Sequence, residues 1–409
     1  MSGDILFLAH RIPYPPDRGD KIRSWHVLKH LAGLARVHLA CFADDETDAD
    51  HLPALKRELG SALGEAYVEV RTTGKLAAAA RAFPAGQPVS VALFDSLRLR
   101  AFVRDVLERQ PVAAIYAFSG QMAQFVPQPC RARFLMDFVD MDSAKFADYA
   151  GEGHGAMRWV HRREAERLFA FERSTAARAD ASIFVSEAEA ALFRAKAGLP
   201  QADIRAIGNG IDLDFYDPAA GFESLERGEG PLILFTGQMD YRPNVDAVTF
   251  YATEVLPRIR ERRPEARFAI VGRQPVRAVT ALAGQAGVTV TGAVPDVRSW
   301  LAAADAVVAP LAIGRGIQNK VLEAMAMARP VVASPAAFNG IEAEPGRDLL
   351  IADGAEAQAR HVLDLLADPA RAAGIGKSAR RRMETHYRWE ARLAPLTRLL
   401  QASARQVAA

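Results

Sequence analysis

The stretch Gly314–Ser334, GRGIQNKVLEAMAMARPVVAS, carries the pattern that decides the fold. A glycine-flanked turn precedes a short amphipathic helix, and the apolar run Val331–Ala333 indicates a buried strand. Lys320 and Glu323 are three residues apart, so they share one face of that helix. A glycine turn at a helix N-terminus presents free backbone N–H groups, which suit a phosphate. The stretch alone also fits an ordinary helix between two strands, so the rest of the chain must decide.

The composition is that of a globular protein with more than one core. The chain has 409 residues, of which 50% are hydrophobic and 24% charged, and two domains are the usual arrangement at this length. The net charge of +2 gives no reason to expect nucleic acid as a partner.

Cysteine use and apolar runs indicate the compartment. Cys41 and Cys130 are the only cysteines, and they have no metal-ligand spacing, so a reducing compartment such as the cytoplasm fits. The first residues, MSGDILFLAHR, indicate a first strand and not a signal peptide. No apolar run approaches the roughly 18 residues that span a bilayer, so we expect a soluble protein that is at most peripheral to a membrane.

Strands and helices alternate along the whole chain, which predicts two doubly wound α/β domains. In the first half we expect strands at 4–9, 37–42, 67–70, 113–117, 133–137, 181–185 and 204–207, and helices at 22–34, 52–63, 75–83, 97–110, 156–179 and 187–195. In the second half we expect strands at 232–236, 267–271, 288–291, 306–309, 331–333 and 349–351, with final helices at 355–366, 369–384 and 389–401. The first domain should cover 1–213 and the second 231–384, with a glycine-rich linker over 217–230.

Several short motifs occur in the order found in one enzyme family. They are Ile207–Asp212 (IGNGID), Phe235–Gly237 (FTG), Val271–Arg273 (VGR), Gly292–Pro295 with Leu301–Asp305, and Glu323–Ala326 with Pro330–Ser334. Together they resemble the GT-B glycosyltransferases of family 4. The segments Gly237–Asn244 (GQMDYRPN) and Arg315–Lys320 (RGIQNK) resemble a narrower branch, the sugar transferases of PEP-CTERM/exosortase exopolysaccharide systems.

The resemblance implies a fold and an activity. It implies two Rossmann-like domains with a cleft between them, an acceptor site on the first and a nucleotide-sugar site on the second. It also implies that a C-terminal helix at 389–405 packs back on the first domain, that the anomeric configuration is retained, and that no metal is required.

Two positions depart from the family pattern. The family commonly has two glutamates separated by seven residues; Glu323 matches the second, but Arg315 stands at the first. The family often has a basic residue after the first glycine of the second domain, and here that residue is Gln238. The resemblance therefore leaves the donor sugar open and requires another cation for the diphosphate.

The expected donor site follows from the chemistry of the leaving group, because donors aimed at the departing diphosphate lower the barrier. Lys320, Arg315 or Arg242 could supply that charge, and the alternative for Lys320 and Arg315 is two solvated cations on a surface loop. Glu323 could bind ribose or sugar hydroxyls, or pair with Lys320. The full set expected at the donor is Gly19, Gly237, Arg242, Gly272, Arg273, Val294, Arg315, Gly316, Ile317 and Gln318, with Lys320, Glu323 and Asp140 expected to act in catalysis.

The first domain offers two polar segments after predicted strands. Gly19 is expected to let the backbone approach the donor phosphate, while Lys21 and Arg23 could serve phosphate or acceptor; a plain loop with surface cations is the alternative. Asp140 and Asp142 spell the D-x-D that chelates a metal in GT-A transferases. Because this chain indicates a different fold, we expect Asp140 or Asp137 to bind the acceptor or accept its proton, without a metal.

The segment Met157–Arg163 interleaves aromatic and basic residues, a pattern that suits an anionic bilayer. Glu164, Glu166 and Glu172 dilute this charge, so a solvated helix also fits.

The sequence thus predicts a cytoplasmic hexosyltransferase, at most peripheral to the inner membrane. It would use a nucleotide-sugar donor (a UDP- or GDP-sugar), need no cofactor, and act on a saccharide or lipid-linked acceptor in exopolysaccharide biosynthesis. A GT-B nucleotide-sugar epimerase and a non-catalytic nucleotide-sugar-binding component remain alternatives.

Overall fold

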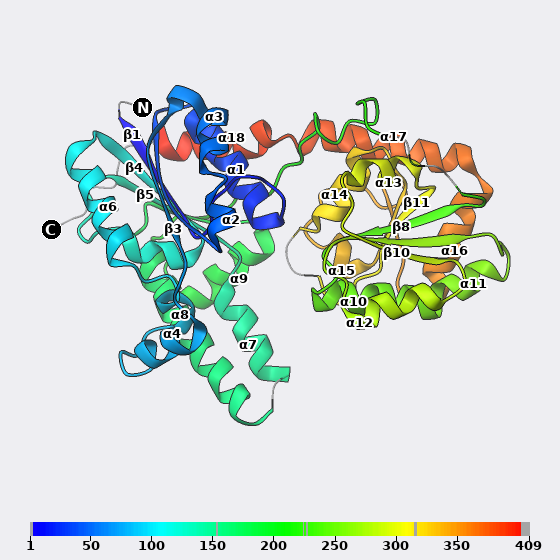
Figure 1. Cartoon of the computed structure of the whole chain (residues 1–409), viewed down its shortest axis with the longest axis horizontal. Helices are drawn as coiled ribbons and strands as arrows, with labels where there is room; N and C mark the ends of the chain where they lie inside the picture. The colour runs from blue at the N-terminus through cyan, green and yellow to red at the C-terminus, as the bar shows by residue number, and fades with distance from the viewer. Residues whose placement is uncertain (1–2, 153, 224, 226–227, 315–316, 402–409) are drawn as a thin grey trace. The chain divides into compact units, whose positions relative to one another are not determined.

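The computed structural model describes residues 3–152, 154–223, 225, 228–314 and 317–401. The chain divides into two compact units, one formed by Met1–Gly208 with Leu393–Ala409 and the other by Asn209–Arg392. Each contains a parallel sheet covered by helices (Figure 1). This arrangement confirms the predicted α/β fold with two doubly wound units.

The first unit is built on seven parallel strands in the order β3-β2-β1-β4-β5-β6-β7. The strands are β1 (Asp4–Ala9), β2 (Val37–Ala43), β3 (Leu63–Val70), β4 (Val112–Phe118), β5 (Arg133–Val139), β6 (Ala181–Phe184) and β7 (Ile204–Ala206). The helices are α1 (Gly19–Ala32), α2 (Glu46–Ala49), α3 (Leu52–Leu59), α4 (Lys75–Ala82), α5 (Val89–Ala92), α6 (Leu97–Arg109), α7 (Asp142–Glu152), α8 (Gly155–Arg178) and α9 (Glu187–Ala197), with 3-10 turns at Gly60–Ala62 and Gly120–Phe125. The last helix, α18 (Trp389–Gln401), joins this unit from Leu393 onward.

The second unit is built on six parallel strands in the order β10-β9-β8-β11-β12-β13. The strands are β8 (Leu232–Thr236), β9 (Arg267–Val271), β10 (Val288–Gly292), β11 (Ala306–Ala309), β12 (Val331–Ala333) and β13 (Leu350–Ile351). The helices are α10 (Arg242–Phe250), α11 (Leu256–Arg260), α12 (Arg277–Thr280), α13 (Val297–Ala303), α14 (Asn319–Ala326), α15 (Pro335–Phe338), α16 (Gly354–Ala367) and α17 (Pro369–His386). A π turn at Tyr251–Val255 and a 3-10 turn at Ala281–Gly284 complete it.

The strands form where the sequence has continuous apolar runs, because both faces of each sheet are covered by helices. The central runs DILFLA in β1 and LILFT in β8 are buried along almost their whole length. All strands predicted from the sequence are present, within a few residues at their ends. Helix α7 was not predicted, and α1 begins at Gly19, three residues before the predicted start.

Each sheet has one point where the strand order reverses, between β1 and β4 in the first unit and between β8 and β11 in the second. In open parallel sheets, ligands bind outside the carboxyl ends of the strands at this switch point. The topology therefore directs attention to the loops after β1 and β4, and to those after β8 and β11.

The turns after β8 and β9 approach each other so closely that only glycine fits at Gly272. A Cβ atom built on Gly272 would lie 1.6 Å from the carbonyl oxygen of Gly237. The amide of Gly237 donates to Val271 O at 3.0 Å, and Met239 N donates to Arg273 O at 2.9 Å. These bonds hold the two turns in one arrangement at the carboxyl edge of the sheet.

We predict that Gly272→Ala lowers the free energy of unfolding of the second unit by about 3 kcal/mol, because the new methyl group must push the Gly237 carbonyl aside. Chemical denaturation of the full chain measures this. Gly374→Ala in α17 is the matched control: its Cβ would meet nothing within 4 Å, and alanine favours a helix by up to about 1 kcal/mol. Equal stability of both variants would contradict the close approach.

Candidate active site

The candidate donor residues lie along the carboxyl edge of the second sheet. Gly237 follows β8, Gly272 and Arg273 follow β9, Val294 lies between β10 and α13, and Ile317 and Gln318 precede α14, which carries Lys320 and Glu323. Arg315 and Gly316 lie outside the described residues. The topology thus brings the described candidates from four strand ends to one edge, where a ligand site is expected.

Lys320 connects the two sides of the switch point. Its Nζ donates to Asn244 Oδ1 at 2.7 Å, and Asn244 Nδ2 donates to Gln238 O at 2.9 Å. Lys320 follows β11, whereas Asn244 lies in α10 after β8, so the bond spans the crevice between these neighbouring strands. A Cβ on Gly237 would lie 2.9 Å from Asn244 Nδ2 and 3.4 Å from Lys320 Cε, so glycine leaves room for both side chains. Sequence reasoning did not identify Asn244, although it lies in the quoted segment GQMDYRPN.

The surroundings of Lys320 favour an anionic ligand. Its Nζ lies 4.9 Å from the centre of the Phe235 ring, and the side chain is half-buried. Burial lowers the pKa of Lys320 to about 8, and the charge of Glu323 opposes this shift. Its hydrogen-bond partner Asn244 is neutral, so the positive charge is only partly compensated.

Glu323 is held by a tyrosine that sequence reasoning missed. The hydroxyl of Tyr216 bonds to the Glu323 carboxyl group; burial raises the pKa of Glu323, while this bond and the charge of Lys320 lower it. Arg380 Nη1 donates to Tyr216 O at 2.6 Å and to Ala326 O, at the end of α14, at 2.9 Å. Arg380 therefore fixes the tyrosine segment against the helix that carries Glu323. Tyr216 directly precedes the stretch interpreted as a linker, 217–230, and it belongs to none of the quoted motifs. The sequence therefore gave no reason to expect it beside Glu323.

The other cation named for the diphosphate, Arg242, points into solvent. Its side chain is 83% exposed, and its Nε lies 3.6 Å from Asp246 Oδ2. Gln238 likewise lies at the surface, where its Nε2 donates to Gln274 Oε1 at 3.3 Å. In this structure Lys320 is the better placed of the two named cations that are described.

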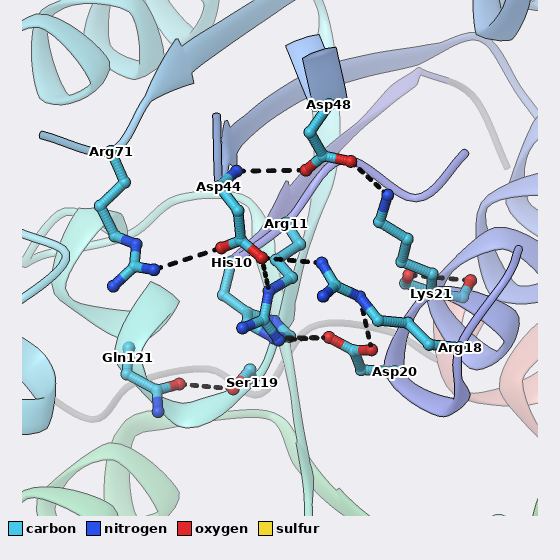
Figure 2. Close-up of polar contacts among 11 residues, drawn as sticks. His10, Arg11, Arg18, Asp20, Lys21, Asp44, Asp48, Arg71, Ser119 and Gln121 are labelled. Atoms are coloured by element: carbon cyan, nitrogen blue, oxygen red, sulfur yellow. Dashed lines mark hydrogen bonds and ion pairs between the residues drawn. The ribbon is translucent and has the colours of Figure 1, made fainter. Parts of the chain in front are cut away.

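The carboxyl edge of the first sheet carries a dense ion-pair network, which Figure 2 shows. Asp44 accepts from three guanidinium groups: Arg11 Nε at 2.8 Å, Arg18 Nη2 at 2.8 Å and Arg71 Nη2 at 3.2 Å. Arg11 also donates to Asp20 at 2.6 Å. These residues follow β1, β2 and β3 or begin α1, so the network ties together three neighbouring strand ends.

Gly19, the candidate expected in a loop, is the first residue of α1. It lies between Arg18, the N-cap residue, and Asp20 in the first turn. Burial would raise the pKa of Asp20, but bonds and charge from His10 and Arg11 hold that pKa well below its usual range. The amide of Gly19 is thus at a helix N-terminus flanked by paired charges.

Lys21 and Arg23 do not serve a ligand, and that expectation was wrong. Lys21 is 3% exposed and forms an ion pair with Asp48, and Arg23 is 1% exposed and pairs with Asp137 at 2.9 Å. Both lie on the inner face of α1. The helix begins three residues earlier than predicted and so also includes Lys21, whereas Arg23 was already inside the predicted helix but faces the core.

Asp137 is also structural, which corrects its expected role as proton acceptor. It is fully buried and accepts from Arg23 Nε at 3.1 Å, Tyr116 Oη at 2.6 Å and Val139 N at 3.1 Å. A carboxylate with these three partners and no exposed surface cannot contact an acceptor.

We predict that Asp137→Ala lowers the free energy of unfolding by about 3–5 kcal/mol, because it leaves the Arg23 charge buried without its partner. Asp105→Ala provides the control: Asp105 pairs with Arg109 on the surface, with side chains 52% and 50% exposed, and its loss should change the stability little because solvent screens the pair. Equal, small losses in denaturant titrations of both variants would show that the buried pair is dispensable.

Asp140 lies just after β5, at the carboxyl edge of the first sheet, and shares a lysine with its neighbour. Lys145 Nζ donates to Asp140 Oδ2 at 3.0 Å and to Asp142 Oδ1 at 2.9 Å. Asp140 is 25% exposed, so it can reach a ligand. Among the described residues, no group of three or more histidine, cysteine, aspartate or glutamate side chains is arranged to hold a metal.

The two doubly wound parallel sheets define the fold class, which is that of the GT-B glycosyltransferases. Residues 230–368 match the family described as "Glycosyl transferases group 1", and residues 147–215 match "Glycosyltransferase Family 4". Both matched segments are thus similar to glycosyltransferase families.

Curated relatives and solved structures agree with this assignment. The GDP-mannose-dependent alpha-(1-6)-phosphatidylinositol monomannoside mannosyltransferase of Mycolicibacterium smegmatis is 30% identical over 242 residues, which cover 54% of this chain and 62% of that protein. The chain thus matches about three fifths of that relative's length. Sucrose-phosphate synthase from Thermosynechococcus elongatus superposes with a TM-score of 0.69 at 18% identity, over 97% of this chain and 98% of that one. Anabaena HepE in complex with UDP gives 0.65 at 17%, over 97% and 99%. At these identities the structures support the fold alone.

Proposed function

We propose that the protein is a hexosyltransferase that moves a sugar from a nucleotide-sugar donor to a saccharide or lipid-linked acceptor. The observation that carries this proposal is the position of Lys320. Its ammonium lies at the switch point of the second sheet, on a neutral partner, 2.7 Å from Asn244 Oδ1. Glu323 lies one turn further along the same helix, bonded to Tyr216.

Lys320 would stabilise the leaving group. As the bond to the anomeric carbon breaks, negative charge grows on the departing diphosphate, and a fixed cation lowers the barrier. The first turn of α14 adds free backbone N–H groups and the positive end of the helix dipole. We place the diphosphate at this turn, beside Lys320. Arg315 and Gly316, which precede the helix in the sequence, are further candidates.

Glu323 would bind donor hydroxyl groups. A buried carboxyl group is costly unless it has partners, and Tyr216 supplies one hydrogen bond to it. Ribose or sugar hydroxyls would supply the others. Since Arg315 replaces the first glutamate of the family pattern, Glu323 would carry more of the sugar recognition alone.

The relatives indicate which donor and acceptor to test first. The Mycolicibacterium relative is a GDP-mannose-dependent enzyme that acts on a phosphatidylinositol mannoside. A GDP-sugar is therefore the first donor to test, and a UDP-sugar the second. We infer that Asp140, on the first unit, binds the acceptor or accepts its proton.

The remaining parts of the proposal rest on the family resemblance. They are retention of the anomeric configuration, catalysis without a metal, and a role in exopolysaccharide biosynthesis of the exosortase-associated type. On the same resemblance we propose that the protein is cytoplasmic and in peripheral contact with the inner membrane. No helix among the described residues is both long and apolar enough to cross a bilayer.

A donor screen tests the proposal. Release of nucleotide from GDP-, UDP-, dTDP- and ADP-sugars would be measured with and without a lipid-linked saccharide extract, with EDTA present throughout. A transferase releases nucleotide and elongates the acceptor only when the acceptor is present. Nucleotide release with a free altered sugar and no acceptor would indicate the epimerase, and calorimetric binding without turnover would indicate a binding component.

We predict that Lys320→Ala lowers kcat by about 10²–10³-fold while the fold is kept, because the variant loses the charge that stabilises the diphosphate. The pH profile sharpens this test. The ammonium is charged below its pKa of about 8 and neutral above it, so kcat/KM should fall as the pH rises through 8. Lys320→Arg should move this fall upward, since a guanidinium stays charged.

The matched control is Lys377→Ala, which removes an exposed lysine of α17 in the same unit. Its kcat and pH profile should match those of the wild type. Near-normal turnover in Lys320→Ala would remove Lys320 from the donor site.

A further inference from the structure

The turn that follows β5 has a backbone conformation that a valine rarely adopts. Val139 has a φ of 69°, in the left-handed region, although its side chain is branched at Cβ. The amide of Asp140 donates to Phe138 O at 2.9 Å, so this bond closes a three-residue turn around Val139. A γ-turn with a positive φ at its central residue is rare and strained. Such a conformation persists only where the surrounding structure fixes it.

The sheet fixes the first half of this turn. Val139 N donates to Asp137 Oδ1 at 3.1 Å, and Val139 O accepts from Val185 N, just after β6, at 2.7 Å. Asp137 is itself held by the bonds from Arg23 and Tyr116 described above. Both backbone polar groups of Val139 are therefore bonded to parts of the sheet that are themselves buried.

Glu189 fixes the second half of the turn. Met141 N donates to Glu189 Oε2 at 2.7 Å, although the two residues are 48 positions apart in the chain. The side chain of Met141 is 2% exposed and packs in the core of the first unit. Asp140 thus lies between two residues with fixed positions, whereas its own side chain is 25% exposed.

The position of Glu189 in the sequence predicts a different bond. Ser186 is the N-cap residue of α9, and its side chain accepts from Glu189 N at 3.2 Å. At a helix start of the form S-x-x-E, the glutamate normally reaches back to the N-cap amide and completes a capping box. Here its carboxylate bonds to Met141 N, in the turn after β5. Natural proteins depart from such local rules mainly at functional sites.

We propose that Glu189 is a positioning residue, which holds the carboxylate of Asp140 at the acceptor through the strained turn at Val139. This role rests on the proposed function, in which Asp140 binds the acceptor or accepts its proton. Lys145 restrains the side chain of Asp140, whereas Glu189 restrains the backbone that carries it. A reacting group that is displaced by about 1 Å can lose about 10²-fold in rate.

Hydrogen exchange over residues 138–145, measured by mass spectrometry on the full chain, tests this restraint. Glu189→Ala removes the acceptor of the Met141 amide, so the exchange of this segment should become at least about tenfold faster. Glu189→Gln keeps an oxygen that can accept the same bond, so its exchange should stay close to that of the wild type. Glu187→Ala is the matched control, since it removes a 70% exposed carboxylate from the same turn of α9, where it pairs with Arg194.

Transfer kinetics with the same variants separate positioning from packing. With the donor selected by the screen and the lipid-linked saccharide extract, Glu189→Ala should lower kcat/KM for the acceptor about 10–10²-fold. Its calorimetric affinity for GDP and UDP should equal that of the wild type, because the proposed donor site is on the second unit. Glu189→Gln and Glu187→Ala should keep near-normal transfer. A cooperative denaturation transition in each variant checks that it is folded.

Unchanged exchange in Glu189→Ala, or unchanged kcat/KM for the acceptor despite faster exchange, would overturn the proposal. A parallel loss of nucleotide affinity and transfer in Glu189→Ala would do so too, because it indicates a general loss of structure. Absence of transfer by the wild type with every donor counts against the proposed function instead, and the exchange result still reports whether Glu189 holds the turn.

Discussion

The hydrogen bond between Lys320 Nζ and Asn244 Oδ1 links the two chain segments that leave the second sheet at its switch point. Strands β8 and β11 are neighbours in the sheet but lie some seventy residues apart in the chain. The partner is an amide, not a carboxylate, so the bond positions the ammonium without cancelling its charge. The side chain is half-buried and its charge interacts with that of Glu323, so the ammonium is only partly compensated. This arrangement supports the diphosphate site that we propose at this edge.

At the equivalent edge of the first unit, the cations are paired with carboxylates instead of with a neutral amide. Asp44 accepts from three guanidinium groups, and Asp20 from Arg11, so these cations already have anionic partners. Further inside, Arg23 and Asp137 form a fully buried pair. A buried pair contributes little net stability, but neither partner can be lost alone. The charged side chains of the first unit therefore pair with one another and fix the strand ends. This supports the proposal that the diphosphate binds to the second unit.

The fold was predictable because parallel strands covered on both faces must be continuous apolar runs, as DILFLA and LILFT are. Lys320 and Glu323 could be named because their spacing and motif are local. Tyr216 and Arg380 could not, since they meet Glu323 and α14 only through tertiary packing over long separations in the chain. Lys21 and Arg23 were misassigned for the same reason: their partners, Asp48 and Asp137, are distant in the chain, so the sequence does not show that these cations are buried in ion pairs.

Helix α8 illustrates how one element can serve packing and surface chemistry without conflict. Its turns repeat every 3.6 residues, so charges that alternate in the sequence separate onto different faces. Glu164 and Glu172 face inward, where they satisfy backbone N–H groups at the starts of α5 and α7. Arg158 and Arg162 face outward, beside Trp159. A sum of the charges over the segment makes them cancel, although they lie on different faces of the helix. The inward carboxylates hold the starts of α5 and α7, and the outward cations stay at the surface of the helix.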